Sequence, residues 1–368
     1  MSDSSSSYGS VGVDYDTLDA AKRTALAQAL TTSRMLEAHG GRAYDESRGE
    51  SAFVFDLEGL TMAIVLECLG TKSMIAREFQ EATGNDRFED IAFDSVAAIV
   101  NDLCCVGALP LVVNAYFATG SAQWYSQGTR KASLVAGWRA ACEEAGATWG
   151  GGESPTLPGL IEPTEIDLAG CAVGYVPKGR SPILGNELAP GDAIILIEST
   201  GLHANGASLA RKVAAGLPEG LATSLPSGRS LGDALLVPAP IYTGVVKSML
   251  DAGIEITYLS HITGHGLRKL MRARQDVTYR LHTLPEVPEV LTYLVEQLDM
   301  DAREAYATFN MGCGFAVYCR ASSADKAVEI ASAGGSAAAL AGWVEEGVKR
   351  VVLEPNGVEF EGEDLQLR

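Results

Sequence analysis

The sequence predicts a mixed α/β (α+β) protein built from two domains. Short apolar runs of strand length alternate with longer segments of helical spacing, and glycine-rich turns follow several of these runs. The length of 368 residues is more than one hydrophobic core usually organises and enough for two. We expect an N-terminal domain over residues 11–177 and a C-terminal domain over 178–368, and we expect the serine-rich residues 1–10 to be disordered.

The composition is that of an ordinary globular protein, with 47% hydrophobic and 20% charged residues. A net charge of −19 leaves no basic stripe to neutralise phosphates, which argues against a nucleic-acid partner. A small phosphorylated substrate remains compatible, because backbone N–H groups, lysine and Mg²⁺ can outweigh the overall charge locally. Seven cysteines without a CxxC spacing fit a reducing compartment. Neither a secretory signal nor an apolar run of membrane length is present, so we expect a cytoplasmic protein with no membrane partner.

In the N-terminal half, a turn-like segment leads into a helix that runs to about residue 37. Residues 51–65 hold two apolar runs around an Asp-Leu-Glu-Gly turn, which predicts a β-hairpin. Residues 67–72 follow at once and read Glu-Cys-Leu-Gly-Thr-Lys. An acid, a glycine, a hydroxyl and a lysine at a strand end predict a corner for phosphate and metal. The pattern is weaker than a full P-loop, because one of the two required glycines is missing.

Residues 94–120 are the stretch around which we organise the chain. Small and apolar residues at helical spacing predict one buried helix face, and Asn101 and Asp102 interrupt it with polar groups. Gly107 is expected to end this helix before a buried strand at 111–116. A metal ion, or a phosphate ligand with its metal, would satisfy a buried Asp102. Alternatively both side chains cap or bridge neighbouring backbone, and the local sequence leaves these two interpretations open.

A helix is expected over 126–145, followed by three consecutive glycines at 150–152 and then Glu153. Three glycines in a row cost conformational entropy, which favours a loop shaped around a ligand. The next strand is expected at 166–176, and residues 178–180 mark the join between the two halves.

In the C-terminal half, a buried strand at 193–198 is followed by a loop rich in Gly, Ser, Thr and Asn and by a helix at 207–215. A loop that ends at a helix N-terminus offers free N–H groups to an anion. His203 lies in this loop, where it could donate to a phosphate or move a proton. A loop histidine bonded to backbone is the alternative, and both remain open.

A second strand–loop–helix turn covers 258–266 and leads into a basic helix at 267–274. We expect Lys269, Arg272 and Arg274 on a solvated face of that helix. The remaining expected elements are helices at 240–252, 291–297 and 324–333, a strand that opens beside Asn310, a strand at 339–344, and a peripheral acidic tail. The sequence contains no HExxH, GxSxG, CxxC or GxGxxG motif, which excludes the common zincin, α/β-hydrolase, thioredoxin and dinucleotide signatures.

A series of collinear segments resembles the aminoimidazole ribonucleotide synthase (phosphoribosylformylglycinamidine cyclo-ligase) family over nearly the whole chain. They are YGSVGVDYD, GTK at 70–72, VNDL with the following GALPLVV and YFATG, GGGESPTLPG, IDLAGCAVG, GLHANGASLAR, LLVPAPIY, SHITGHG and TFNMGCGF.

The resemblance implies a two-domain PurM-like fold, in which the N-terminal domain pairs with its copy to close a dimeric β-barrel and the C-terminal domain is α/β. It also implies an ATP-dependent reaction in purine synthesis. ATP phosphorylates the amide oxygen of formylglycinamidine ribonucleotide, an amidine nitrogen attacks that carbon, and phosphate leaves as the imidazole ring closes.

The resemblance further implies roles for individual residues. His203, Lys72 and Asp102 would be catalytic, and Asp102 and Glu67 would hold Mg²⁺. The nucleotide would be bound by Glu67, Gly70, Thr71, Lys72, Asp94, Asn101 and Glu153. The substrate would be bound by Gly152, Asn205, Gly206, His261, Thr263, Gly264 and Asn310.

This chain departs from the family pattern at three places. Glu67-Cys68-Leu69 stands where the family writes the start of DGVGTK, the family's GGFG-like loop is absent from residues 40–52, and His265 replaces the central glycine of TGGG. Two alternatives to the family's reaction therefore stay open. One is a diverged member that activates another amide or acid with ATP. The other is a non-catalytic relative that binds nucleotide or a partner enzyme.

Overall fold

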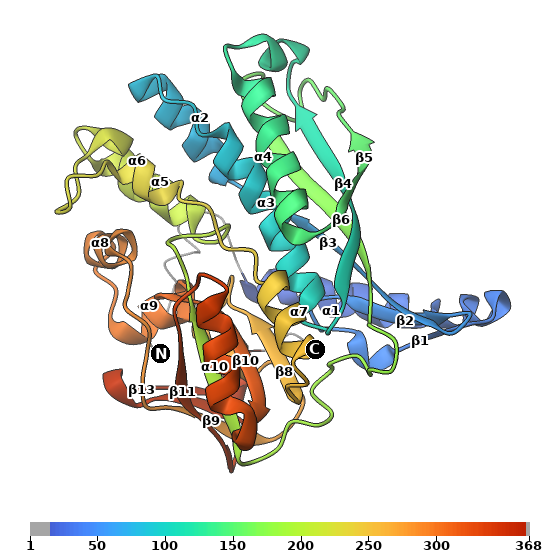
Figure 1. Cartoon of the computed structure of the whole chain (residues 1–368). Helices are drawn as coiled ribbons and strands as arrows, with labels where there is room; N and C mark the ends of the chain where they lie inside the picture. The colour runs from blue at the N-terminus through green and yellow to red at the C-terminus, as the bar shows by residue number, and fades with distance from the viewer. Residues whose placement is uncertain (1–14, 366–368) are drawn as a thin grey trace.

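The computed structural model describes residues 15–365, and these fold into two α/β domains, each with its own sheet (Figure 1). The N-terminal sheet has six strands in the order β1-β2-β3-β6-β4-β5, antiparallel except for the parallel pair β4–β5. Its elements are α1 (Tyr15–Leu30), β1 (Gly41–Ala43), β2 (Phe53–Leu57), β3 (Leu60–Cys68), α2 (Lys72–Thr83), α3 (Phe88–Cys104), β4 (Leu109–Thr119), α4 (Arg130–Ala145), β5 (Thr148–Glu153) and β6 (Ile166–Tyr175).

The C-terminal sheet has seven strands in the order β13-β12-β9-β11-β7-β10-β8. Its first half comprises β7 (Asp192–Glu198), α5 (Ala207–Gly216), α6 (Leu231–Leu235), α7 (Thr243–Asp251), β8 (Ile256–His261), the 3₁₀ helix η7 (Gly266–Met271) and β9 (Val277–Leu281). Its second half comprises α8 (Glu289–Gln297), α9 (Ala302–Thr308), β10 (Cys313–Arg320), α10 (Ala324–Ala333), β11 (Ala338–Glu346), β12 (Arg350–Leu353) and β13 (Val358–Glu361).

Helix α3 is the centre of the N-terminal domain. It packs across β3, β6 and β4 with α2 and α4 on either side, so one face of the sheet is covered by helices (Figure 1). The predicted buried face of this helix is confirmed, because Val96, Val100 and Leu103 are fully buried. Packing of this apolar face, rather than helix propensity, fixes the helix in place.

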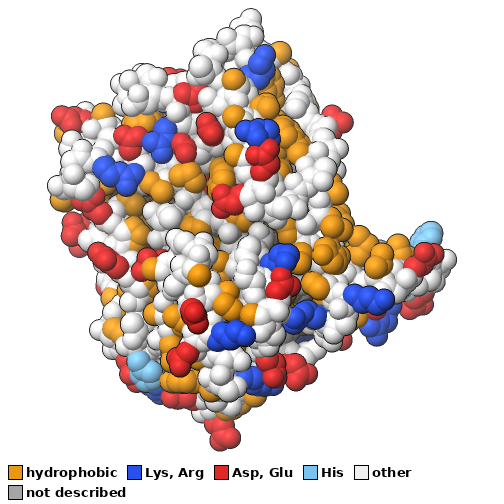
Figure 2. All heavy atoms as spheres, viewed as in Figure 1, with side chains coloured by type: hydrophobic (Ala, Val, Ile, Leu, Met, Phe, Trp, Pro, Cys, Tyr) orange, Lys and Arg blue, Asp and Glu red, His pale blue; other side chains and the backbone are white. Residues whose placement is uncertain are grey.

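The opposite face of the N-terminal sheet is partly apolar and exposed. Figure 2 shows hydrophobic side chains gathered along the flank of the molecule where these strands run. The exposed large hydrophobic residues on β3 and β4 are Leu60, Ile64, Leu66, Leu111 and Val112.

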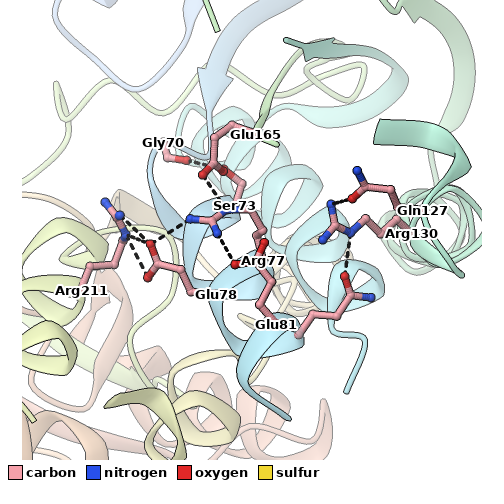
Figure 3. A network of polar contacts seen from close by, with 10 residues as sticks. Gly70, Ser73, Arg77, Glu78, Glu81, Gln127, Arg130, Glu165 and Arg211 are labelled. Atoms are coloured by element: carbon pink, nitrogen blue, oxygen red, sulfur yellow. Dashed lines mark hydrogen bonds and ion pairs between the residues drawn. The ribbon is translucent and has the colours of Figure 1, made fainter. Parts of the chain in front are cut away.

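The two domains touch through helices of the N-terminal domain. Helix α3 contacts α7 and β8, and α2 contacts α5. Figure 3 shows the polar part of the second contact, where Glu78 on α2 accepts hydrogen bonds from Arg211 on α5 at 2.7 Å. Arg77 on the same helix joins Glu165, just before β6, at 2.6 Å. Nearby, the hydroxyls of Thr71 and Ser208 lie 2.9 Å apart, so the starts of α2 and α5 meet.

Most of the expected strands and helices are present, and the corrections have local causes. Helix α1 ends at Leu30 rather than near residue 37, because the hydroxyls of Thr31 and Thr32 bond back to carbonyls of the preceding turn. Helix α4 begins at Arg130 rather than 126, after Gly128 adopts a left-handed conformation with φ +54°. The expected helix start at 240 is wrong, since α7 begins only at Thr243, and residues 237–242, which contain two prolines, are neither helix nor strand.

The glycine run at 150–152 is a strand and not a loop. It lies in β5, and a Cβ atom on Gly152 would come within 2.0 Å of the Ala115 carbonyl oxygen on β4. Close approach of two strands therefore accounts for this glycine. The basic helix expected at 267–274 is instead the short 3₁₀ helix η7, which ends at Met271.

Two further expectations concern the ends and the surroundings of the chain. The expected disorder of residues 1–10 and the YGSVGVDYD segment through residue 14 lie outside the described residues. Within residues 15–365, none of the helices combines the length and the apolar character that crossing a bilayer requires.

Candidate active site

A pocket of about 230 Å³ lies where α3, the end of β3, β8 and η7 come together. Side chains from both domains line it, so it depends on the contact between α3 and β8. Its lining residues are Lys22, Glu67, Cys68, Ala98, Asp102, Ala204, Asn205, His261, Thr263, Gly264, His265, Lys269 and Arg272. A larger cavity of about 620 Å³ lies beside residues 179–187, and none of the predicted site residues lines it.

Asp102 and His261 form the polar centre of this pocket. Asp102 lies in the last turn of α3, and its Oδ1 is 2.7 Å from Nδ1 of His261 at the end of β8. Burial disfavours the charged carboxylate, but the His261 hydrogen bond and the nearby cations outweigh it and lower the pKa of Asp102. A carboxylate at Nδ1 orients the ring and leaves Nε2 as the atom that can exchange a proton.

Glu67 at the end of β3 faces Asp102. Burial and the neighbouring Asp102 charge raise the pKa of Glu67 to about 7, although Lys269 opposes this shift. Two carboxyl groups this close repel when both are ionised, and a divalent cation would relieve that repulsion. Among residues 15–365 there is no group of three His, Cys, Asp or Glu side chains able to hold a metal ion. The donor set therefore fits Mg²⁺ only if phosphate oxygens or water complete its coordination, which is the usual arrangement for this ion.

Lys269 and Arg272 contradict the expectation of a solvated face. Lys269 is only 8% exposed, and its ammonium donates a hydrogen bond to the Thr263 hydroxyl. The Arg272 guanidinium donates to the Gly49 carbonyl at 3.0 Å and to the Ser51 hydroxyl at 2.8 Å. Both cations lower the pKa of Asp102 at the C-terminal end of α3, where the helix dipole also favours positive charge.

Lys72 and Asp94 do not line the pocket. Lys72 begins α2, and its Nζ is 2.5 Å from Oδ2 of Asp94, with both side chains fully buried. Asp94 and Asp102 are eight positions apart on α3, which separates them by about 12 Å along the helix. The pair is an ion pair inside the domain, and burial raises the pKa of Asp94 while Lys72 opposes that shift.

Asn101 and Asp94 tie the two domains together. The Asn101 amide accepts a hydrogen bond from the Tyr242 N–H at 2.8 Å and donates to the Pro240 carbonyl at 2.9 Å. Asp94 Oδ1 accepts from the Ala239 N–H at 2.7 Å. Of the two interpretations that the sequence left open, the backbone-bridging one therefore holds for Asn101, although the bridged backbone belongs to the other domain.

The loop between β7 and α5 is held by its own histidine. His203 is 3% exposed, has a left-handed φ of +59°, and accepts the Thr200 N–H at 3.2 Å through Nε2. Its Nδ1 is buried and makes no hydrogen bond with residues 15–365. Burial, with additional repulsion from His261 and Lys72, lowers the pKa of His203 well below its usual value, so the ring is neutral.

Asn205 lines the pocket two positions after His203, and Gly206 caps α5 with a φ of +94°. A Cβ atom at Gly206 would lie 2.6 Å from the Phe309 ring, so only glycine fits there. Asn310 holds this loop through side-chain hydrogen bonds. Its amide donates to the Gly201 carbonyl at 2.8 Å and accepts from the Ser199 hydroxyl at 2.7 Å.

The remaining predicted site residues lie in three different places. Thr263 and Gly264 line the pocket beside His261, and Gly70 and Thr71 form the turn that leads into α2. Gly152 and Glu153 do not line the pocket. They lie on β5, three strands away from Glu67 across the sheet, which is about 14 Å at the normal strand spacing.

The chain matches two family models that together cover most of its length. Residues 49–176 match the "AIR synthase related protein, N-terminal domain" and residues 189–354 match the "AIR synthase related protein, C-terminal domain". The chain belongs to the AIR synthase related family.

Named relatives and solved structures agree with this assignment. The phosphoribosylformylglycinamidine cyclo-ligase of Methanothermobacter thermautotrophicus is 34% identical over 284 residues, which cover 77% of this chain and 80% of the relative. The enzyme of the same name from Methanobrevibacter smithii is 32% identical over 326 residues, covering 88% and 90%. The crystal structure of the hydrogenase maturation protein HypE in complex with ATP has a TM-score of 0.58 at 20% identity, covering 83% of this chain and 85% of that one, and shows the same fold.

In this chain, two of the three departures from the family motifs face the same pocket. Glu67 and Cys68 come from the altered DGVGTK-type motif, and His265 stands at the central glycine of the TGGG-type motif. His265 has a left-handed φ of +72°, a conformation that glycine adopts more readily than a residue with a side chain. The sequence did not lead us to predict Lys269 and Arg272 as site residues. Their position shortly after the SHITGHG motif is the feature that could have identified them.

Proposed function

We propose that this chain is a phosphoribosylformylglycinamidine cyclo-ligase that uses ATP in purine biosynthesis. Relatives that carry this name are 30–36% identical to the chain over 72–88% of its length. The observation that carries the proposal is the pocket between the domains, where Glu67 and Asp102 face Lys269 and the loop before α5. Such a pocket suits a triphosphate with its cation on one side and a polar substrate on the other.

The proposed reaction has two parts. The γ-phosphoryl group of ATP passes to the amide oxygen of formylglycinamidine ribonucleotide, and ADP leaves. An amidine nitrogen then attacks the activated carbon, the C–O bond to phosphate breaks, and the nitrogen loses a proton as the imidazole ring forms. Phosphorylation is needed because an amide oxygen is a poor leaving group and phosphate is a good one.

Glu67 and Asp102 are the residues that would hold Mg²⁺, and the ion when bound would neutralise charge on the transferring phosphate. Asp102 also holds the His261 ring, so His261 Nε2 is placed to accept the proton that the attacking nitrogen releases. Asn205 and Thr263 supply hydrogen-bonding groups for the substrate from the C-terminal domain. The neutral His203 keeps the 200–203 backbone in the shape that presents this wall.

We also propose a homodimer formed through the exposed face of the N-terminal sheet, which would close the β-barrel expected from the family. Leu60 and Leu66 are 63% and 70% exposed, which is unusual for leucines that share one sheet face. A matching copy would bury them. A cytoplasmic location is proposed because all seven cysteines are free thiols, as expected in a reducing compartment.

The deciding experiment measures ADP release with ATP alone, with formylglycinamidine ribonucleotide added, and with other amides. ADP release that requires the ribonucleotide, together with formation of aminoimidazole ribonucleotide, supports the proposal. Turnover with a different amide only would indicate a diverged activity. Nucleotide binding by a folded protein without turnover of any amide would indicate a non-catalytic relative.

A further inference from the structure

Lys269 is a buried cation in the wall of the pocket, and neutralising the neighbouring carboxylates does not by itself explain its position. It is only 8% exposed on η7, directly before the buried apolar residues Leu270 and Met271, and it faces the carboxylates of Glu67 and Asp102. Burying an ammonium is costly unless its partners compensate. The two residues that follow it on η7 are apolar and fully buried, so packing alone does not require a lysine at this position.

Arg272, the other buried cation, has a different set of partners. Its guanidinium is held by the Gly49 carbonyl and the Ser51 hydroxyl, with the Glu50 carboxylate 3.9 Å away. These contacts join the segment before β2 to the end of η7. Arg272 therefore stabilises the fold at this point. The Lys269 ammonium has three N–H donors, and its hydrogen bond within residues 15–365 is to the Thr263 hydroxyl.

The carboxylates that face Lys269 are not wholly available to pair with it. Asp102, one of the two carboxylates that Lys269 faces, already accepts a hydrogen bond from His261 at 2.7 Å. The hydrogen bond to Thr263 uses one of the three N–H donors of the ammonium. An anionic oxygen that arrives in the pocket would meet the remaining donors.

We propose that Lys269 is a catalytic cation that contacts the phosphoryl group as it passes from ATP to the amide oxygen, with Thr263 orienting its ammonium. The proposal rests on the ATP-dependent function given above and adds a residue to it. Lys269 acts from the C-terminal domain, opposite the carboxylates of Glu67 and Asp102 in the N-terminal domain. A lysine in this place stabilises negative charge on the phosphoryl oxygens without donating or losing a proton.

The test compares binding of ADP with binding of AMPPCP, a non-hydrolysable ATP analogue, by isothermal titration calorimetry with Mg²⁺ present. If Lys269 contacts the transferring phosphoryl group, Lys269→Met lowers the preference for AMPPCP over ADP by about 10-fold or more, the value of one charge-assisted hydrogen bond. Lys269→Arg keeps most of the preference. Arg274→Met is the matched control, because Arg274 is an exposed cation of the same segment that bonds to the Glu46 carbonyl.

Two further variants keep the test decisive if Lys269→Met unfolds. Thr263→Val removes the hydroxyl that orients the ammonium and lowers the preference, whereas Thr263→Ser retains it. An unchanged preference in folded Lys269→Met or Thr263→Val overturns the proposal. So does a variant whose only defect is a raised KM for the ribonucleotide, which would place Lys269 at the substrate's own phosphate. Wild-type protein that binds neither nucleotide would instead refute the proposed function.

Discussion

The carboxylate of Asp102 and the imidazole of His261 meet at 2.7 Å although 159 positions separate them in the chain. Asp102 lies in the last turn of α3 in the N-terminal domain, and His261 ends β8 of the C-terminal domain. The contact therefore forms only when the two domains pack against each other. Assembly of the pocket around Asp102 and His261 therefore requires both domains to be folded and packed together.

Asp102→Asn tests whether this carboxylate serves the reaction or the fold. The amide preserves the shape but removes the charge that would hold a cation and orient His261. We expect turnover to fall by about 10²-fold or more, the typical loss for one electrostatic group at a reacting centre. Glu89→Gln, an exposed acid on the same helix, is the control. Loss of the folded state in Asp102→Asn, seen by circular dichroism, would assign the residue a structural role.

Lys72 and Asp94 provide a test of a fully buried ion pair. Lys72→Met alone leaves an unpaired buried carboxylate, and we expect a loss of about 3–5 kcal/mol in the free energy of unfolding. The double variant Lys72→Met/Asp94→Leu should cost clearly less than the two single changes added together. Urea unfolding of all four proteins gives the coupling energy. Additivity within about 0.5 kcal/mol would mean that the two groups do not stabilise each other.

Features governed by local sequence were predictable, and features governed by distant contacts were not. The buried strand β7 and the β2–β3 hairpin follow from apolar runs and an Asp-Leu-Glu-Gly turn. The apolar face of α3 follows from helical spacing. By contrast, basic residues at 267–274 ordinarily face solvent, and Lys269 and Arg272 are buried only because Asp102 and residues 49–51 lie against them. No local pattern contains that information.

The site residues show the same division. Motif resemblance identified Asp102, His261 and Thr263, which line one pocket. The glycine run beside Glu153 indicated a ligand loop, yet Gly152 is explained by its approach to Ala115 across the sheet. A close strand contact and a ligand loop both require glycine, so the sequence alone does not separate them.

Glu67 makes Mg²⁺ binding dependent on pH. Its raised pKa of about 7 means that the carboxyl is largely protonated at pH 6 and largely ionised at pH 8. A metal ligand must be deprotonated, so Mg²⁺ affinity of the AMPPCP complex should rise across this interval. Calorimetric titrations of Mg²⁺ at pH 6 and pH 8 measure the rise. Glu67→Gln should flatten it, and an equally steep rise in that variant would exclude Glu67 as a ligand.

His265 makes the folded state sensitive to acid. Burial, with repulsion from Lys269 and other cations, lowers the pKa of this imidazole to about 3 in the folded protein, against about 6.5 when unfolded. Between these values the unfolded state binds a proton that the folded state does not, so the free energy of unfolding falls as the pH falls. At 1.36 kcal/mol for each pH unit, lowering the pH from 6.5 to 5 should cost wild type about 2 kcal/mol through this residue. His265→Gln should lose that part of the decline, while His39→Gln, which removes an exposed imidazole, should follow the wild-type curve. Urea unfolding at pH 5, 6 and 7.5 measures the difference, and parallel curves for wild type and His265→Gln would show that the buried ring accepts its proton without cost.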